Sequence, residues 1–296
     1  MSRKSFHILC STTNILHIIV ISGSAREDSI QTLVTDTDVI ILAIASGATR
    51  DVVSRIKPFL NKRTVLLNVA KALDSESGKR LSEVISDILP KETFCYAALA
   101  GGTIAHDLFG HQPLGIDIAS ENHLVLESLR QLFESETLNV YTTTDLKGLE
   151  YASSFKNIIS ILAGIVHGLG FSYGSETHLI SRAAREVQNL AISLGATPET
   201  FSMASQCWGN DLWMSCTGST RNREFGIYIG KGNAPETAVQ VMREQKKTVE
   251  GLSTLRIIKK LINSDEYPIL HAIHSTAIEG NDARTALQEL MRCNHI

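Results

Sequence analysis

Apolar residues in the first half of the chain fall into short runs that are separated by small or polar residues and by amphipathic segments. Such runs, bounded by turn residues, predict strands at 17–22, 38–46, 64–69, 94–99, 115–119 and 138–142. The segments between them predict helices at 50–60, 77–89 and 123–133. Strands that alternate with helices are typical of βαβ units built around a mostly parallel sheet.

From about residue 145 onward the pattern is almost wholly helical. We therefore predict two domains. Residues 1–144 should form an α/β domain with a Rossmann-like parallel sheet, complete or incomplete, and residues 145–296 an all-α domain. The boundary carries no flexible linker, so we expect the two domains to pack closely.

The segment 150–171 is long, free of proline and apolar on nearly every side, which is typical of a buried helix. It contains one lysine, Lys156. Small residues share the face of this lysine: Ala152, Ser153, Ser160 and Ala163. Burial lowers the pKa of an amine and can make it a general acid or base. The alternative is a lysine that extends past small side chains to solvent.

Composition and charge exclude several classes of protein. A hydrophobic content of 43% and a charged content of 20% describe an ordinary globular protein, and the net charge of −3 gives no reason to expect nucleic acid as a partner. Five scattered cysteines without a C-x-x-C favour neither a disulfide framework nor a zinc site, so we expect no metal and a cytoplasmic location. No apolar run approaches the roughly 18 residues of a membrane span.

Three predicted strands end in residues that suit a ligand, because open parallel sheets bind ligands beyond the carboxyl ends of their strands. Ser46 and Gly47 follow the second strand, Lys71 follows the third, and 101–103 follow the fourth. Each could equally be an ordinary turn. No G-x-G-x-x-G dinucleotide fingerprint follows the first strand, and 23–25 are its nearest match.

The helical half carries a polar constellation after Gly209. Asp211 lies just behind this glycine and could meet a buried lysine, while Arg221 and Asn222 could bind a phosphate through a guanidinium fork and an amide. Hydroxyl groups add donors nearby: Ser215, Thr217 and Thr220. The alternative is a polar loop with a helix-capping aspartate and solvated arginines.

With these residues in place, the chain resembles the bacterial NAD(P)-dependent glycerol-3-phosphate dehydrogenases. The resemblance rests on FKNIISILAG, LISRAARE, GNDLWMSCTGSTRNREFG, TVEG and YPILHAIHSTAI in the second half. In the first half it rests on DVIILAIAS, NVAKALDSESGKRLSEV and AGGTIAHDL, and in all it covers about 30–293. It implies the interconversion of dihydroxyacetone phosphate and sn-glycerol 3-phosphate with NAD or NADP, for phospholipid synthesis. It also suggests a homodimer.

The resemblance implies a role for each matching residue. Lys156 would be the catalytic acid and base, and Asp211 would orient it. Contacts to a small phosphorylated substrate would come from Lys71, Gly101, Thr103, Lys156, Asn157, Asp211, Ser215, Thr220, Arg221 and Asn222. Contacts to the cofactor would come from Lys71, Ala105, Arg221, Val249 and Glu250.

Two alternatives follow from departures from the family pattern. The family opens with a strand and a G-x-G-x-W-G turn, which has no match before Asp38. A catalytically impaired or non-catalytic relative would fit that difference. Another β-hydroxyacid-type dehydrogenase with an active-site lysine is the second alternative, and against it the pair Arg221 and Asn222 favours a phosphorylated substrate.

Overall fold

The computed structural model describes residues 17–22, 31, 34–90, 93–103, 107, 110 and 112–292. The chain divides into two compact units, residues 1–150 and 151–296. The domain boundary between residues 144 and 145, which the helical pattern predicts, stays a prediction. Below, the first is called the sheet unit and the second the helical unit.

The sheet unit is built on six strands that are hydrogen-bonded in the order of the sequence. They are β1 (Ile18–Ile21), β2 (Val39–Leu42), β3 (Val65–Asn68), β4 (Cys95–Ala100), β5 (Leu114–Ala119) and β6 (Leu138–Thr143). Strands β1 to β4 are parallel, β5 is antiparallel to β4, and β6 is parallel to β5. The predicted, mostly parallel sheet is confirmed. Strand β2 is shorter than predicted, because Ser46–Ala48 form a 3₁₀ turn, η1, that leads into the next helix.

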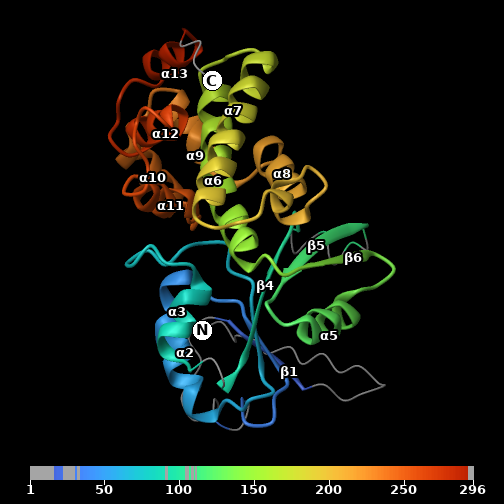
Figure 1. Ribbon diagram of the computed structural model, residues 1–296. Helices are drawn as coiled ribbons and strands as arrows, with labels where there is room; N and C mark the ends of the chain where they lie inside the picture. Colours follow the sequence, from blue (N-terminus) through green and yellow to red (C-terminus); the bar gives the residue numbers. More distant parts are fainter. Residues whose placement is uncertain are drawn as a thin grey trace. The chain divides into compact units, whose positions relative to one another are not determined.

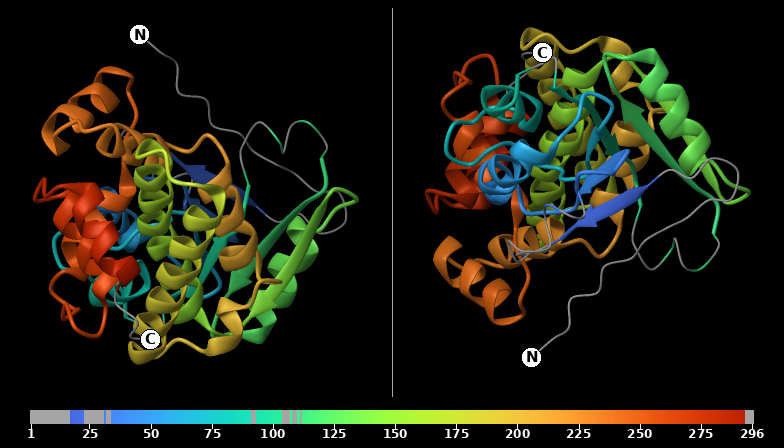
Figure 2. Two further views of the ribbon diagram at one scale, coloured as in Figure 1. Left: turned by 90° about the horizontal axis from the view of Figure 1, so that it is seen from above. Right: turned by 90° about the horizontal axis from the view of Figure 1, so that it is seen from below.

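Helices cover both faces of this sheet (Figures 1 and 2). They are α2 (Thr49–Ile56), which continues into the 3₁₀ turn η2 (Lys57–Phe59), α3 (Leu81–Ile88) and α5 (His123–Phe133). On one face α2 and α3 pack on Ile40, Leu42 and Leu66, and on the other α5 packs on Ile116 and Ile118. Because neighbouring residues of a strand point to opposite faces, strands buried on both faces read as continuous apolar runs.

Helix α3 begins four residues later than the helix predicted over 77–89. At its start the backbone N–H of Arg80 donates to Glu83 Oε2 at 2.9 Å, which is one half of a capping box. The residues before it form a loop around Asp74, whose carboxylate accepts the N–H of Ser77 at 3.0 Å. Gly78, at φ 73°, permits the left-handed turn of this loop.

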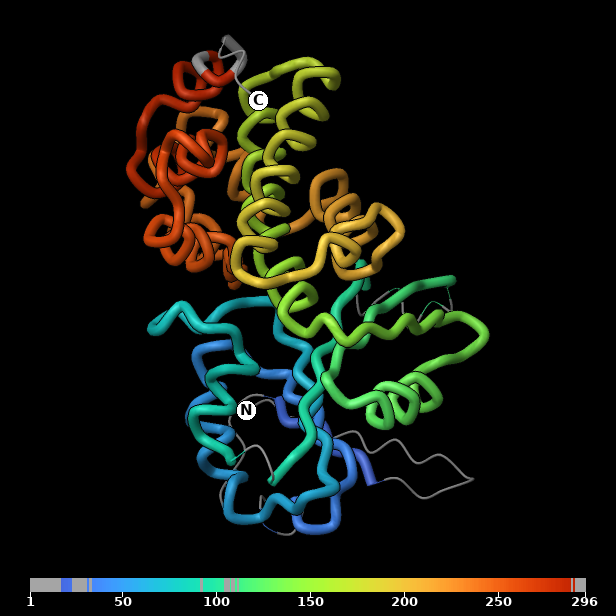
Figure 3. Tube along the Cα trace, in the orientation of Figure 1, coloured from blue at the N-terminus to red at the C-terminus, as the bar shows by residue number. Residues whose placement is uncertain are grey.

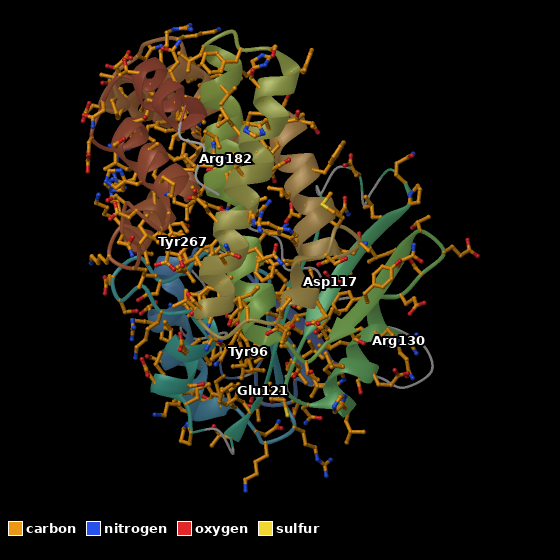
Figure 4. All side chains as sticks on the ribbon, turned by 45° about the horizontal axis from the view of Figure 1, so that its top comes forward. Tyr96, Asp117, Glu121, Arg130, Arg182 and Tyr267 are labelled. Atoms are coloured by element: carbon orange, nitrogen blue, oxygen red, sulfur yellow. The ribbon has the colours of Figure 1, made fainter. Side chains whose placement is uncertain are left out.

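Glu150 ties the first turns of α6 (Leu146–Gly168) to α3 within the sheet unit. Its carboxylate accepts from Arg80 Nη1 at 3.0 Å, from the Ser82 N–H at 2.9 Å and from the Tyr96 hydroxyl at 3.2 Å. Figure 4 labels Tyr96 among the side chains of the sheet unit. Burial raises the pKa of both Glu150 and Tyr96. The guanidinium of Arg80 therefore compensates the charge of the Glu150 carboxylate, which is buried away from water.

The helical unit confirms the predicted all-α second half. After α6 it contains α7 (Tyr173–Ser193), η4 (Pro198–Phe201), a single π turn η5 (Gln206–Asn210), α8 (Asp211–Thr217), α9 (Arg221–Gly230), α10 (Pro235–Glu244), α11 (Glu250–Ile258), α12 (Pro268–Ala277) and α13 (Ala283–Arg292). Helices α7 and α9 run beside α6 (Figures 1 and 3). No helix among the described residues is long and apolar enough to cross a membrane.

Helix α6 confirms the long buried helix, with shifted ends. It begins at Leu146, where the carboxylate of Asp145 accepts the N–H of Gly148 at 2.9 Å. It ends at Gly168 because Gly170 adopts φ 73° and the N–H of Phe171 turns back to the carbonyl of Val166 at 3.3 Å. This is a Schellman motif, in which glycine is favoured at the left-handed position.

Helices α6 and α9 touch through their backbones at glycines. A Cβ added to Gly164 of α6 would lie 2.0 Å from the carbonyl oxygen of Arg223, and one added to Gly226 of α9 would lie 2.1 Å from that of Ile161. Gly168 and Gly230 meet in the same way one turn along. These four glycines form the glycine contact, which holds the two helices closer than any larger residue would allow.

The remaining helices attach to α7. The carboxylate of Glu186 accepts the free N–H groups of Ile269 and Leu270 at the start of α12, at 2.9–3.0 Å. Arg182, labelled with Tyr267 in Figure 4, donates through Nη1 to the carbonyl of Leu290 at 2.9 Å. Helix α7 thereby fixes both α12 and α13 by hydrogen bonds as well as by packing.

Candidate active site

Lys156 lies in the middle of α6 and is 5% exposed. Its Nζ donates to Asp211 Oδ1 at 2.6 Å and to Ser215 Oγ at 2.8 Å. The alternative of a lysine extended to solvent is therefore wrong. A buried ammonium needs such partners, because an unpaired charge away from water is costly.

The π turn η5 and helix α8 bring Asp211 to this lysine. Gly209 packs so closely that an added Cβ would lie 2.1 Å from the carbonyl oxygen of Met203, so a side chain there would open the turn. Asp211 follows as the first residue of α8 and is fully buried. A carboxylate in the first turn of a helix is stabilised by the backbone dipoles.

Ser215 and Thr220 are joined to this ion pair by a network of hydroxyl groups. The carbonyl of Ser215 accepts from Ser160 Oγ at 2.7 Å and from Thr220 Oγ1 at 3.0 Å. Sequence reasoning placed Ser160 only as a small neighbour of Lys156. Its position one turn after the lysine was the available signal, and only the structure shows its acceptor.

Asn222 connects three helices through its side-chain amide. Its Nδ2 donates to Asn157 Oδ1 of α6 at 3.0 Å, and its Oδ1 accepts the N–H of Gly251 in α11 at 3.0 Å. Gly251 was not among the predicted site residues. The amide retains one further N–H beyond these two contacts, and the side chain is nearly buried.

Arg221, by contrast, has a side chain that is 53% exposed, with Nη2 3.5 Å from Glu250 Oε1. Val249 is the residue before α11, and Glu250 is the first residue of that helix. Two of the three cofactor residues predicted for the helical half, Val249 and Glu250, therefore lie directly before Gly251, whose N–H donates to Asn222.

Residues at the strand ends of the sheet unit form a separate group. Lys71 Nζ donates to the carbonyl of Gly101 at 2.5 Å, and the N–H of Thr103 donates to the same carbonyl at 2.8 Å. Gly101 has no room for a side chain, because an added Cβ would lie 2.7 Å from the carbonyl oxygen of Gly115. Ala105 and 23–25 lie outside the described residues.

The pKa values of two neighbouring groups limit the available chemistry. Burial raises the pKa of Cys216 to about 12, so its thiol stays protonated near Lys156 and is no nucleophile. Burial alone would raise the pKa of Asp74, but hydrogen bonds from Ser77 and Arg50 outweigh it and hold the pKa below its usual value. Within the described ranges, no group of three or more His, Cys, Asp or Glu residues could hold a metal ion.

Two family models match the chain. The model of the NAD-dependent glycerol-3-phosphate dehydrogenase C-terminus matches residues 145–288, and that of the N-terminus matches residues 14–126. The chain belongs to the NAD-dependent glycerol-3-phosphate dehydrogenase family. The N-terminal model matches within the sheet unit, and most of the C-terminal match lies in the helical unit.

Curated members of this glycerol-3-phosphate dehydrogenase family are similar along most of their length. The glycerol-3-phosphate dehydrogenase (NAD(P)+) of Myxococcus xanthus is 32% identical over 268 residues, which are 89% of this chain and 78% of the relative. That of Chlorobium phaeobacteroides is 34% identical over 278 residues, covering 92% and 82% of the two chains. The crystal structure of glycerol-3-phosphate dehydrogenase from Coxiella burnetii matches with a TM-score of 0.79 and 26% identity, covering 88% of this chain and 79% of that one.

Proposed function

We propose that this chain interconverts dihydroxyacetone phosphate and sn-glycerol 3-phosphate and thereby supplies glycerol 3-phosphate for phospholipid synthesis. One observation carries the proposal. Lys156 is a buried ammonium that donates to Asp211 and Ser215, in a chain that belongs to this dehydrogenase family. A buried, oriented proton donor is what reduction of a ketone requires.

The proposed chemistry adds a hydride to C2 of the ketone and a proton to its oxygen. NAD(P)H, when bound, supplies the hydride. The Lys156 ammonium gives its proton to the oxygen as that atom gains negative charge, and takes it back in the reverse direction. Asp211 holds the ammonium in place, so the lysine does not need to reorganise as charge develops. Ser215 fixes a second N–H of the same group.

Arg221 and Asn222 are the proposed phosphate ligands. The planar guanidinium of Arg221 can offer two parallel N–H donors to a phosphate, and its exposure leaves it accessible. Asn222 is held by Asn157 and Gly251, so only its remaining N–H can be directed at a ligand. Thr220, whose hydroxyl donates to the Ser215 carbonyl, is proposed as a further contact to the substrate.

The described residues at the strand ends fit a dinucleotide. The turn after β2 is open, since a Cβ at Gly47 would meet nothing within 4 Å, and this edge of a parallel sheet is where nucleotides bind. We assign NAD or NADP to Lys71 and Ala105 in the sheet unit, and to Arg221, Val249 and Glu250 in the helical unit. Gly101 and Thr103 would contact substrate. A homodimer and a cytoplasmic location belong to the same proposal, the latter because three described cysteines are free thiols.

The test is a spectrophotometric assay of dihydroxyacetone phosphate reduction with NADH and with NADPH. Lys156→Ala should lower kcat by about 10²-fold or more, as expected when a general acid is lost. Lys147→Ala is the matched control, because Lys147 is an exposed lysine of the same helix. Equal turnover of the wild type and Lys156→Ala would contradict the proposed role.

A second candidate is a relative with impaired catalysis. The absence of a G-x-G-x-x-G among the 296 residues favours it, because that turn and the following helix N-terminus normally bind the pyrophosphate. Titration calorimetry with NADH, NADPH and glycerol 3-phosphate separates the two candidates. Binding of glycerol 3-phosphate without either nucleotide would support the impaired relative, and low-micromolar binding of a nucleotide would reject it.

A further inference from the structure

Ser160 is fully buried one helical turn after Lys156, and no step of the proposed chemistry uses it. Its Oγ donates to the carbonyl of Ser215 at 2.7 Å and lies 3.0 Å from Thr220 Oγ1. The same Ser215 presents its own Oγ to Lys156 Nζ at 2.8 Å. A single residue of α8 is therefore held through its backbone by Ser160 and contacts the lysine through its side chain.

The carbonyl that Ser160 binds belongs to the last turn of α8. The last four carbonyls of a helix have no partner within the helix, and a buried one needs a donor from elsewhere. The carbonyl of Met214 accepts the N–H of Gly218 at 2.9 Å. That of Ser215 instead takes hydroxyls from α6 and from Thr220, the residue before α9. The end of this seven-residue helix is thus fixed from two sides.

The hydroxyl groups of Ser160 and Thr220 carry one hydrogen each, but take part in three contacts. Since each hydroxyl can donate its hydrogen to one acceptor, only two of the three contacts can be hydrogen bonds at one time. Both hydroxyls can donate to the Ser215 carbonyl together. Removal of one leaves this carbonyl with a single donor, and removal of both leaves a buried acceptor without a donor.

We propose that Ser160 is a positioning residue for proton transfer at Lys156. Together with Thr220 it fixes the backbone of Ser215, and so keeps the Ser215 hydroxyl at hydrogen-bonding distance from the lysine ammonium. The inference rests on the proposed function, in which this ammonium donates the proton. It assigns to Ser160 an effect on the chemical step, through the position of the Ser215 hydroxyl.

Ser160→Ala tests this directly, because it removes the hydroxyl and adds no atom. We expect kcat to fall about 3- to 10-fold, the effect of one neutral hydrogen bond, with KM nearly unchanged. The pH profile of kcat/KM should move to lower pH, because an ammonium with a misplaced acceptor gives up its proton more readily.

Ser275→Ala is the matched control. Ser275 is a buried serine of the same unit, and its hydroxyl donates to the carbonyl of Ala272 in its own helix at 3.0 Å. It should change neither kcat nor the pH profile. In the double variant Ser160→Ala/Thr220→Val, the loss in kcat should exceed the product of the two single losses, because this variant removes both hydroxyl donors to the Ser215 carbonyl.

A measurement without turnover separates this inference from the proposed function. The side-chain ¹⁵N signal of Lys156 in lysine-labelled protein should shift in Ser160→Ala and stay unchanged in Ser275→Ala. If the wild type reduces no dihydroxyacetone phosphate, the proposed function fails and the ¹⁵N signal still decides the position of Ser160. If the double variant does not fold, Ser160→Ala alone decides. A wild-type pH profile and an unshifted signal in that variant would overturn the inference.

Discussion

Arg221 and Asn222 are neighbours in sequence, but their side chains have different freedom. The side-chain oxygen of Asn222 accepts the N–H of Gly251, and its Nδ2 donates to Asn157. The protein itself therefore fixes this side chain. Arg221 is half exposed, and its Nη2 lies 3.5 Å from Glu250 Oε1. At the scale of residues, we therefore expect Arg221 to supply phosphate affinity and Asn222 to supply a rigid frame.

Arg221→Ala should lower kcat/KM for dihydroxyacetone phosphate. The loss of transition-state stabilisation should be about 2–4 kcal/mol, the range for removing a charged partner of a bound anion. Unphosphorylated dihydroxyacetone should be a poor substrate for the wild type and lose little more in the variant. The exposed Arg243→Ala is the control. Equal losses for both substrates would show that Arg221 acts on something other than phosphate.

Lys246 stores strain at the end of α10. Its φ of 57° is the left-handed conformation, and its neighbour Lys247 donates its N–H back to the carbonyl of Met242 at 2.9 Å. This is the Schellman geometry in which α6 uses Gly170. Lys246 therefore occupies a position that favours glycine.

Lys246→Gly should raise the free energy of unfolding by about 0.5–1 kcal/mol, because glycine adopts the left-handed conformation without steric cost. Lys231→Gly is the matched control at the end of α9, where φ is −79° and no strain is relieved. Urea unfolding of both variants provides the measurement. A destabilised Lys246→Gly would refute the strain.

At the scale of elements, the glycine contact sets the distance between α6, which carries Lys156, and α9, which carries Arg221 and Asn222. Two G-x-x-x-G repeats, 164–168 and 226–230, place one glycine above another on each helix face. Without side chains between them, the two backbones meet directly. The spacing of two functional groups thus depends on residues that take no part in chemistry.

Gly226→Ala should destabilise the protein by about 3 kcal/mol, because its Cβ would lie 2.1 Å from the Ile161 carbonyl oxygen and both helices would have to separate. Gly174→Ala is the control. Gly174 lies in α7, and its Cβ would meet only Ser172 Oγ at 3.9 Å, so alanine should stabilise the helix by about 0.5–1 kcal/mol. Thermal unfolding distinguishes the two, and a Gly226→Ala protein as stable as the wild type would disprove close backbone packing.

Much of the element level could be predicted from the sequence, since it depends on local patterns. Composition and length are enough to predict the apolar strands β1 to β6 and the long, proline-free helix α6. The late start of α3 could not be predicted, because Asp74 draws Ser77 into a loop through side-chain hydrogen bonds. At the site, Lys156 and Asp211 were predicted, but Ser160 was not assigned a role. The acceptor of Ser160 is the backbone carbonyl of Ser215, 55 residues away. Every residue has a backbone carbonyl, so the sequence does not indicate which one a distant side chain will bind.

At the scale of the whole molecule, acidification should act through His274. This histidine of α12 is buried, with Nδ1 3.2 Å from Glu279 Oε1. Burial lowers its pKa, Lys259 and His271 lower it further, and Glu279 opposes them. The pKa of His274 is therefore lower in the folded state than in the unfolded state. Its contribution to the free energy of unfolding is fully present at a pH above the unfolded pKa, and is lost as the pH falls through the folded pKa.

The free energy of unfolding should therefore decrease between about pH 7 and pH 5, where an ordinary histidine takes up its proton. In His274→Gln, part of this decrease should disappear, because no proton can be bound at that position. The exposed His178→Gln should keep the wild-type dependence. Urea unfolding over this range gives the measurement, and identical slopes for the wild type and His274→Gln would assign the acid sensitivity to other groups.

The glycine contact also has a genetic consequence. Every single-base change in a glycine codon that is not silent introduces either a residue with a Cβ or a stop. At Gly164, Gly168, Gly226 and Gly230 each such residue would press into the backbone of the facing helix. A saturation library selected for activity of this protein should therefore show four positions at which almost every missense allele is lost. Close packing of two bare backbones should therefore be visible as a pattern of lost alleles.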